Sequence, residues 1–192
     1  MNLAFCVFDG MTPLDFVGAY DPITRLERMG FRSIEWDVCG RTDRVSAAGL
    51  TVDVDCVNPR LDDYDLVFVP GGPATRTLVD DEPFVDWLRS ADPDGYLVSV
   101  CTGSLLLGAA GFLEGKRATT HPAAMELLSG YAEAVEDRVV IDGRVITGGG
   151  VAASIDLGLV VVEKLADRPT REAIAEQLDY PYGPWGTDAA VR

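Results

Sequence analysis

Residues 96–110 read YLVSVCTGSLLLGAA, a strand pattern that passes directly into a helix pattern. The run from Tyr96 to Val100 has the length and apolar character of a buried strand, and the leucine-rich segment after Cys101 has the composition of a helix. Cys101 therefore stands at the turn between the two elements. This position is typical of a nucleophile elbow, in which a sharp strand-to-helix turn exposes a side chain above a sheet and a neighbouring backbone N–H faces a developing oxyanion.

The same position predicts an activated thiol. Unpaired N–H groups and the helix macrodipole favour negative charge at a helix start, so we expect the pKa of Cys101 to lie below the usual thiol value. The alternative is that Cys101 is a small buried core residue, which is the commonest place for a free cysteine. The elbow context favours the nucleophile.

Strand and helix patterns alternate over the rest of the chain. Strands are predicted at residues 2–8, 34–39, 66–69, 96–100 and 118–120, with hairpins at 45–54 and 139–147. Helices are predicted after Cys101 and at residues 13–29, 83–90, 122–128, 153–165 and 170–178. This alternation predicts one α/β domain over residues 1–192, with a mostly parallel sheet covered by helices on both faces. Its core spans about residues 2–180, and residues 181–192 form a C-terminal tail.

Charge and hydropathy restrict the partners of the chain. Its 31 acidic and 16 basic side chains give a formal net charge of −15, which repels nucleic acid and anionic membranes. A solvated acidic surface of this kind is typical of a salt-adapted, halophilic organism. The sequence lacks both an apolar run of about 18 residues and a basic flank near Met1, so we expect a cytoplasmic protein with no membrane span.

The cysteines do not form a metal or redox motif. No two of the four cysteines form a C-x-x-C pair, and no histidine cluster lies beside them, so no metal site is predicted; they are Cys6, Cys39, Cys56 and Cys101. Cys6 and Cys39 lie inside apolar strand patterns and are expected in the core. The glycine run at residues 148–150 is too short for a dinucleotide fingerprint, and no P-loop is present, so we expect no cofactor.

Ligands of doubly wound sheets bind beyond the carboxyl ends of the strands. The loops that follow the predicted strands at that edge contain most of the chemically distinctive residues of this chain. They comprise residues 9–15, 70–72, 101–102, 121 and 148–150. We therefore expect one small-molecule site at this edge of the sheet.

Four motifs, in this order along the chain, resemble the DJ-1/PfpI superfamily. They are Val69-Pro70-Gly71-Gly72, Ser99-Val100-Cys101-Thr102-Gly103-Ser104, Thr119-Thr120-His121-Pro122 and Asp142-Gly143-Arg144-Val145-Ile146-Thr147-Gly148-Gly149-Gly150. The resemblance runs from residue 2 to about residue 180. Residues 8–15 (FDGMTPLD) and 101–104 (CTGS) are most similar to the isonitrile hydratase branch. The resemblance implies a flavodoxin-like three-layer sandwich that forms a homodimer.

The resemblance also implies a reaction and the residues that perform it. A hydratase of this branch is a lyase that adds water to a small unsaturated substrate, R–N≡C, and releases an N-substituted formamide. Cys101 would be the nucleophile that forms a thioimidate, Asp15 the acid and base near its sulfur, and Thr102 the neighbour that positions substrate or water. The polar pocket around them would contain Gly71, Gly72, His121, Gly149 and Gly150.

Each of these residues also has a structural interpretation. Asp15 is the third helical residue after Thr12, a spacing close to that of a capping box. Thr102 fits the cap of the following helix, and Gly71-Gly72 fits an ordinary turn at a strand end. His121 is the only histidine, but it does not follow the nucleophile directly, so a protease-like Cys-His dyad is absent and a structural role is favoured.

Two other functions remain open. Gly18 is followed by Ala19 where the hydratase branch has Gly-Pro, which leaves a DJ-1-like glyoxalase or deglycase that acts on small dicarbonyls as an alternative. A non-catalytic ligand-sensing domain is the other. The Pro, Gly and aromatic residues at 180–186 predict a segment that packs on the domain, with a lid or subunit contact as the alternative.

Overall fold

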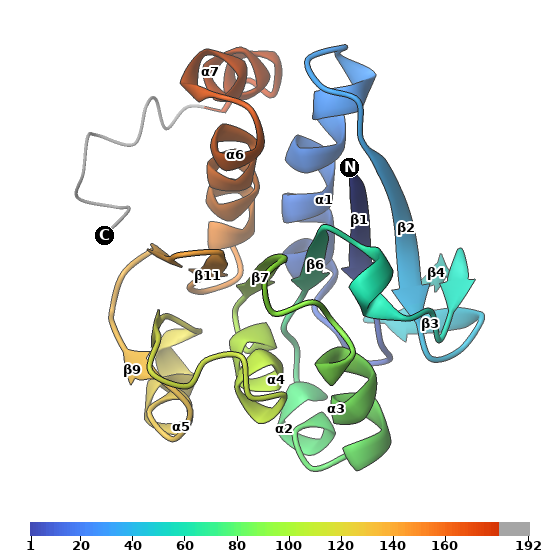
Figure 1. Cartoon of the computed structure of the whole chain (residues 1–192), viewed down its shortest axis with the longest axis vertical. Helices are drawn as coiled ribbons and strands as arrows, with labels where there is room; N and C mark the ends of the chain where they lie inside the picture. The colour runs from blue at the N-terminus through green and yellow to red at the C-terminus, as the bar shows by residue number, and fades with distance from the viewer. Residues whose placement is uncertain (181–192) are drawn as a thin grey trace.

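The computed structural model describes residues 1–180, which fold around one seven-stranded sheet (Figure 1). In spatial order its strands are β10 (Val139–Asp142), β11 (Val145–Gly148), β7 (Tyr96–Val100), β6 (Leu66–Val69), β1 (Asn2–Cys6), β2 (Glu35–Gly40) and β5 (Cys56–Val57). Every neighbouring pair is parallel except β10 and β11, which are antiparallel. Two further two-stranded sheets pair β3 (Arg44–Ala47) with β4 (Leu50–Asp53), and β8 (Arg117–Ala118) with β9 (Glu133–Ala134).

Helices cover both faces of the central sheet (Figure 1). One face carries α1 (Pro13–Arg28), α6 (Ala153–Leu165) and α7 (Arg168–Gln177). The other carries α2 (Thr75–Leu78), α3 (Glu82–Arg89), α4 (Gly103–Ala109) and α5 (Met125–Leu128), together with the 3₁₀ turns η1 (Leu61–Asp63) and η2 (Pro122–Ala124). Because both faces are covered, the central strands are mostly apolar, and all four residues of β6 are apolar and buried.

Close packing between α1 and α6 fixes one helix layer. A Cβ atom at Gly18 would lie 2.1 Å from Ser154 Oγ, so only a glycine allows the two helices to approach this closely. The Ser154 hydroxyl donates to the Leu14 carbonyl at 3.0 Å, which satisfies the polar side chain inside the helix contact. This contact places the first turn of α1, and with it Asp15, against the end of the sheet.

The predicted α/β architecture is confirmed, and the differences are local. Four short elements, β5, η1, α2 and β9, are absent from the sequence-based prediction because two to four residues are too few to show a period. The strand predicted at residues 118–120 is wrong beyond Ala118, because β8 pairs only with β9. The helix predicted at residues 122–128 divides into η2 and α5. The predicted tail, residues 181–192, lies outside the described residues.

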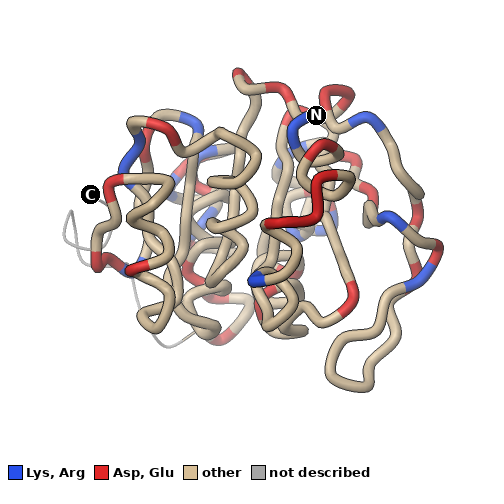
Figure 2. The backbone as a smooth tube through the Cα atoms, turned by 90° about the horizontal axis from the view of Figure 1, so that it is seen from below, with Lys and Arg blue, Asp and Glu red and all other residues tan. Residues whose placement is uncertain are grey.

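Acidic residues are spread over the molecule, as they are along the sequence. Figure 2 shows acidic residues on many elements around the molecule, with arginines and lysines between them. Within residues 1–180, no helix combines the length and the apolar character needed to cross a membrane.

Candidate active site

Cys101 connects β7 to α4 in a left-handed backbone conformation, with φ of 54°. A non-glycine residue in this region costs about 1–3 kcal/mol, so the surrounding structure must hold it there. The Cys101 N–H donates to the carbonyls of Gly148 at 2.9 Å and Gly149 at 2.8 Å. The Cys101 carbonyl accepts from the hydroxyls of Thr120 at 2.8 Å and Ser104 at 3.2 Å. Both backbone polar groups are thus bound, and the elbow is fixed from two sides.

Asp15 meets Cys101 across the end of the sheet. It is fully buried in the first turn of α1, its Oδ2 accepts from the Gly71 N–H at 3.1 Å, and its carboxyl interacts with the Cys101 thiol. Within residues 1–180, Asp15 Oδ1 has no hydrogen-bond partner. A buried carboxyl with an open oxygen beside a thiol is an arrangement that acid–base chemistry requires and that stability alone does not.

Gly71 makes this approach possible. A Cβ atom at this position would lie 2.8 Å from Asp15 Oδ2, 2.8 Å from Cys101 Cβ and 2.6 Å from the Thr102 nitrogen. The carboxyl, the thiol and the elbow amide therefore surround a position that has no room for a side chain. The turn interpretation of Gly71 is insufficient, because the absence of a side chain here is what lets the Asp15 carboxyl approach the Cys101 thiol.

The two ionisable groups perturb each other. Burial raises the pKa of Asp15 to about 6, although its contacts with the Cys101 thiol and the Gly71 N–H oppose this rise. Burial also raises the pKa of Cys101 to about 11, and the charge of Asp15 adds to the effect. The Thr102 N–H and hydroxyl favour the thiolate but do not outweigh these causes. Near neutral pH, the pair rests as a neutral thiol beside a carboxylate and titrates as a unit.

The predicted depressed pKa of Cys101 is therefore wrong. That prediction considered only the helix that begins after the elbow, whereas α4 starts at Gly103 and contains just seven residues. Burial and the Asp15 carboxylate act on the thiol more strongly than this short helix. At neutral pH the Cys101 thiol therefore keeps its proton unless a neighbouring group accepts it.

Thr102 holds the loop opposite the thiol. Its hydroxyl accepts from the Gly72 N–H at 3.0 Å and donates to the Gly72 carbonyl at 3.2 Å. It makes no capping bond to α4, so the cap interpretation of Thr102 is wrong. Because the N–H groups of Gly71 and Gly72 already donate to Asp15 and Thr102, these glycines shape the pocket and do not offer free donors to a substrate.

The capping-box interpretation of Asp15 is also wrong. The Thr12 side chain makes no capping bond, and the Thr12 N–H donates to the Gly71 carbonyl at 2.9 Å. Neither half of the reciprocal bond pair of a capping box is therefore present. This leaves the contacts with Gly71 and Cys101 as the explanation for a buried acid in this helix turn.

The remaining predicted pocket residues lie beside the elbow. His121 Nδ1 accepts from the Ala123 N–H at 3.1 Å, so the histidine caps η2 and the favoured structural role is confirmed. Gly149 binds the Cys101 N–H through its carbonyl, and Gly149 and Gly150 line a cavity of about 310 Å³ together with Thr120. Of His121, Gly149 and Gly150, Gly149 is the one that binds the elbow directly.

Sequence reasoning missed the two hydroxyls that hold the Cys101 carbonyl. Ser104 and Thr120 are buried polar residues in apolar surroundings, and such groups need partners. The available signal was their place near the carboxyl edge, Thr120 just before His121 and Ser104 in the first turn of α4. Within residues 1–180, no three His, Cys, Asp or Glu side chains lie where they could hold a metal ion.

The fold and this site define a class of protein, a flavodoxin-like α/β domain that presents a cysteine on a strained elbow beside a buried carboxyl. The chain belongs to the DJ-1/PfpI family, whose model matches residues 1–164.

Individual relatives agree with this assignment. The chain is 38% identical to isonitrile hydratase of Pseudomonas putida over 186 residues, which covers 96% of this chain and 80% of the relative. It is 30% identical to the HTH-type transcriptional regulator CdhR of Pseudomonas aeruginosa over 90% of this chain, but it spans only 53% of that protein.

Solved structures show the same fold. A THiJ/PfpI family protein from Pseudomonas syringae superposes with a TM-score of 0.86 at 32% identity, covering 98% of this chain and 78% of the other. Drosophila melanogaster DJ-1beta superposes with a TM-score of 0.82 at 23% identity, covering 94% and 98% of the two chains.

Proposed function

We propose that this protein is a cysteine-dependent hydratase that converts a small isonitrile into an N-substituted formamide. The observation that carries the proposal is the pairing of Cys101 with a buried carboxyl, Asp15, whose Oδ1 is unpartnered within residues 1–180. The 38% identity to isonitrile hydratase over 96% of the chain supports the choice of substrate.

The first step uses the resting protonation state of the pair. The Asp15 carboxylate takes the proton of the Cys101 thiol while the sulfur bonds to the terminal carbon of R–N≡C. That carbon then carries an electron pair, and Asp15 returns the proton to it. The product is a thioimidate, Cys–S–CH=N–R, and Asp15 is again a carboxylate. A carboxyl with a pKa of about 6 is suited to hold and release a proton in this way.

The second step uses the same carboxylate as a base. Asp15 accepts a proton from water as the water oxygen bonds to the thioimidate carbon, and it then passes this proton to the nitrogen. The C–S bond breaks, the hydroxyl of the intermediate loses its proton as the formyl C=O forms, and the sulfur is protonated again. The sum of the two steps is R–N≡C plus water giving R–NH–CHO.

Formamide release from cyclohexyl isocyanide tests the proposal. Mass spectrometry should detect N-cyclohexylformamide with the wild type and none with Cys101→Ala, whereas Cys56→Ala is a matched control that removes a half-exposed thiol outside the site. Intact-mass analysis of Asp15→Asn should show no accumulated thioimidate, because without the carboxylate the Cys101 thiol does not lose its proton in the first step. If the wild type, at high salt and with its thiol intact, releases no formamide, the hydratase proposal is wrong.

A second candidate function is ligand sensing by the same pocket, which the similarity to the transcriptional regulator favours. A sensor would bind a ligand near Cys101 without turning it over, and its response would persist in Cys101→Ala. The dicarbonyl alternative is tested in the same assay series with methylglyoxal as substrate. The homodimer and the cytoplasmic location also stay predictions, and light scattering of the purified protein tests the first.

A further inference from the structure

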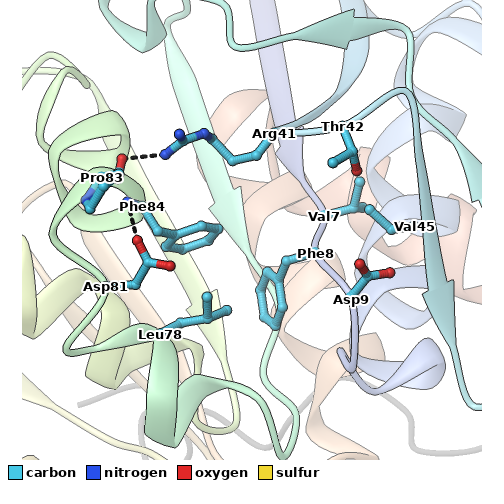
Figure 3. Close-up of a pocket in the computed structure, with 10 residues that line it drawn as sticks. All are labelled: Val7, Phe8, Asp9, Arg41, Thr42, Val45, Leu78, Asp81, Pro83 and Phe84. Carbon is cyan, nitrogen blue, oxygen red and sulfur yellow. Dashed lines mark hydrogen bonds between the residues drawn. The ribbon is translucent and has the colours of Figure 1, made fainter.

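A second cavity lies at the carboxyl edge of the sheet, apart from Cys101. Its volume is about 340 Å³, within the range of small-molecule sites. Residues from the ends of β1 and β2, from β3 and from α2 and α3 line it (Figure 3); they are Val7, Phe8, Asp9, Arg41, Thr42, Val45, Leu78, Asp81, Pro83 and Phe84. None of the residues assigned to the Cys101 site is among them, so the proposed hydratase does not use this cavity.

The floor of the cavity is apolar and ordered. The rings of Phe8 and Phe84 meet edge to face, with centroids 5.7 Å apart and an interplanar angle of 86°, and Val45 is a further apolar residue of the lining. Both phenylalanines are at most 5% exposed, so their rings are held by the core. Such a floor accepts a compact aromatic or branched aliphatic group.

The rim of the cavity carries charges of both signs. The Arg41 guanidinium reaches across it and donates to the Pro83 carbonyl (Figure 3), and no carboxylate of residues 1–180 forms an ion pair with it. The guanidinium has further N–H donors besides the one used here. Arg41 is therefore anchored in place while most of its donors remain available for an anionic group.

Two carboxylates stand at the rim with Arg41. Asp9 Oδ1 accepts from the Ser46 N–H at 2.7 Å, and Asp81 Oδ1 accepts from the Phe84 N–H at 3.0 Å. Each carboxylate is thus oriented through one oxygen and keeps a second oxygen for a ligand. Since the rim offers both a fixed cation and fixed anions above an apolar floor, it is complementary to a molecule with one ammonium, one carboxylate and one apolar group.

We propose that this cavity binds a free amino acid with an apolar side chain. The α-carboxylate binds Arg41, the ammonium binds Asp81 or Asp9, and the side chain rests on Phe8 and Phe84. The site is independent of the hydratase proposal. It is connected to the Cys101 site through the chain, because the segment after Asp9 leads to Thr12, whose N–H binds the Gly71 carbonyl.

Isothermal titration of the whole chain with L-phenylalanine tests this proposal, with phenethylamine and 3-phenylpropionate as probes that lack one charge each. We expect L-phenylalanine to bind and each single-charge probe to bind at least about tenfold more weakly, since each loses a charge-assisted hydrogen bond. Trp87 gives a second readout, because its ring lies 5.6 Å from that of Phe84 and its fluorescence should change on binding.

Variants with little structural cost locate the site. Asp81→Asn and Asp9→Asn keep the side-chain length and one oxygen acceptor, and Arg41→Gln keeps a polar side chain with N–H donors but no charge. Arg41→Gln and at least one Asn variant should weaken binding about tenfold or more. Arg76→Gln and Asp80→Asn are matched controls on exposed charges that do not line the cavity, and Cys101→Ala should bind as the wild type does. The proposal is overturned if L-phenylalanine gives no heat up to about 10 mM, if a single-charge probe binds equally well, or if the three rim variants behave like the controls.

Discussion

Cys101 and Cys39 are both buried thiols near the carboxyl ends of parallel strands, and each has an acidic side chain nearby. Burial raises the pKa of both thiols, to about 11 for Cys101 and about 12 for Cys39. Burial and acidity therefore do not distinguish the candidate nucleophile from a core cysteine. The difference lies in the backbone and in the groups around each sulfur.

Cys39 sits in a regular strand, in register with Cys6 on one side and Cys56 on the other. Its thiol donates to the Asp37 carbonyl at 3.6 Å, and the nearby Asp37 carboxylate already accepts from the Tyr64 hydroxyl at 2.8 Å. Cys101 instead lies outside the strand geometry, beside a carboxyl with an open oxygen. Under the proposed function, Cys101 differs from Cys39 because its neighbour Asp15 can take its proton, whereas its own acidity contributes little.

The largest difference between the two sites is expected when each sulfur is removed. Cys101→Ala should lower isonitrile turnover by at least about 10³-fold, because no other group can form the thioimidate. Cys39→Ala should change turnover by less than about threefold, since that thiol packs in the core. Steady-state rates of the two folded variants, measured side by side, check this. A large loss of turnover in Cys39→Ala, with the stability unchanged, would show that Cys39 takes part in the reaction and would contradict the assignment to Cys101.

The next largest effect is expected when the Asp15 carboxyl is removed. Asp15→Asn should lower the rate by about 10²–10⁴-fold, because the amide can still accept from the Gly71 N–H but cannot exchange a proton with the sulfur. Asp37→Asn provides the corresponding change beside Cys39 and should leave the rate close to that of the wild type. The prediction fails if the two variants lose activity equally.

The same substitution should stabilise the protein in a pH-dependent way. A carboxyl with a pKa of about 6 in the folded chain and about 3.9 when unfolded costs roughly 3 kcal/mol of stability above pH 6, and this cost disappears as the pH falls towards 4. Asp15→Asn should therefore be more stable than the wild type at pH 8, with the difference vanishing near pH 4. Urea unfolding at several pH values measures it. Asp80→Asn, an exposed control, should show no such pH dependence.

A smaller effect tests the support of the elbow. Thr120→Val removes the hydroxyl that binds the Cys101 carbonyl, and Thr24→Val removes a buried hydroxyl that binds a helix carbonyl far from the site. Each change should cost about 1 kcal/mol of stability. Only Thr120→Val should also lower turnover, by about tenfold, because it loosens the strained backbone of the nucleophile. Equal rates in the two variants would show that this bond is only structural.

The smallest expected effect is on stability and compares the backbone conformations at positions 101 and 39. At position 101, Gly should be about 1 kcal/mol more stable than Ala, because the left-handed φ of 54° costs nothing for glycine. At position 39 the order should reverse by about 0.5–1 kcal/mol, since glycine loses more entropy in a strand. Thermal unfolding of the Gly and Ala variants at both positions measures the sign of each stability difference. The same sign at both positions would show that the elbow is not strained.

Local patterns predicted most of the fold because apolar strand runs and helical segments are properties of neighbouring residues. The position of Cys101 at an elbow followed from the same patterns. What local patterns could not show was the pair of hydroxyls from Ser104 and Thr120 on the Cys101 carbonyl, since Thr120 reaches it only after β7 and β8 are placed. Thr12 and Asp15 had the spacing of a capping box, yet both bind Gly71 instead.

The amino-acid sequence by itself determined the alternating α/β architecture, the place of Cys101 at its strand-to-helix elbow and the membership in the DJ-1/PfpI family. The tertiary structure alone decided the protonation of the site. A pKa depends on burial and on charges that are near in space, and the carboxyl that acts on Cys101 comes from the first turn of α1, far away in the sequence. Gly71 completes this arrangement, because the absence of its side chain matters only once Asp15, Thr102 and Cys101 surround it.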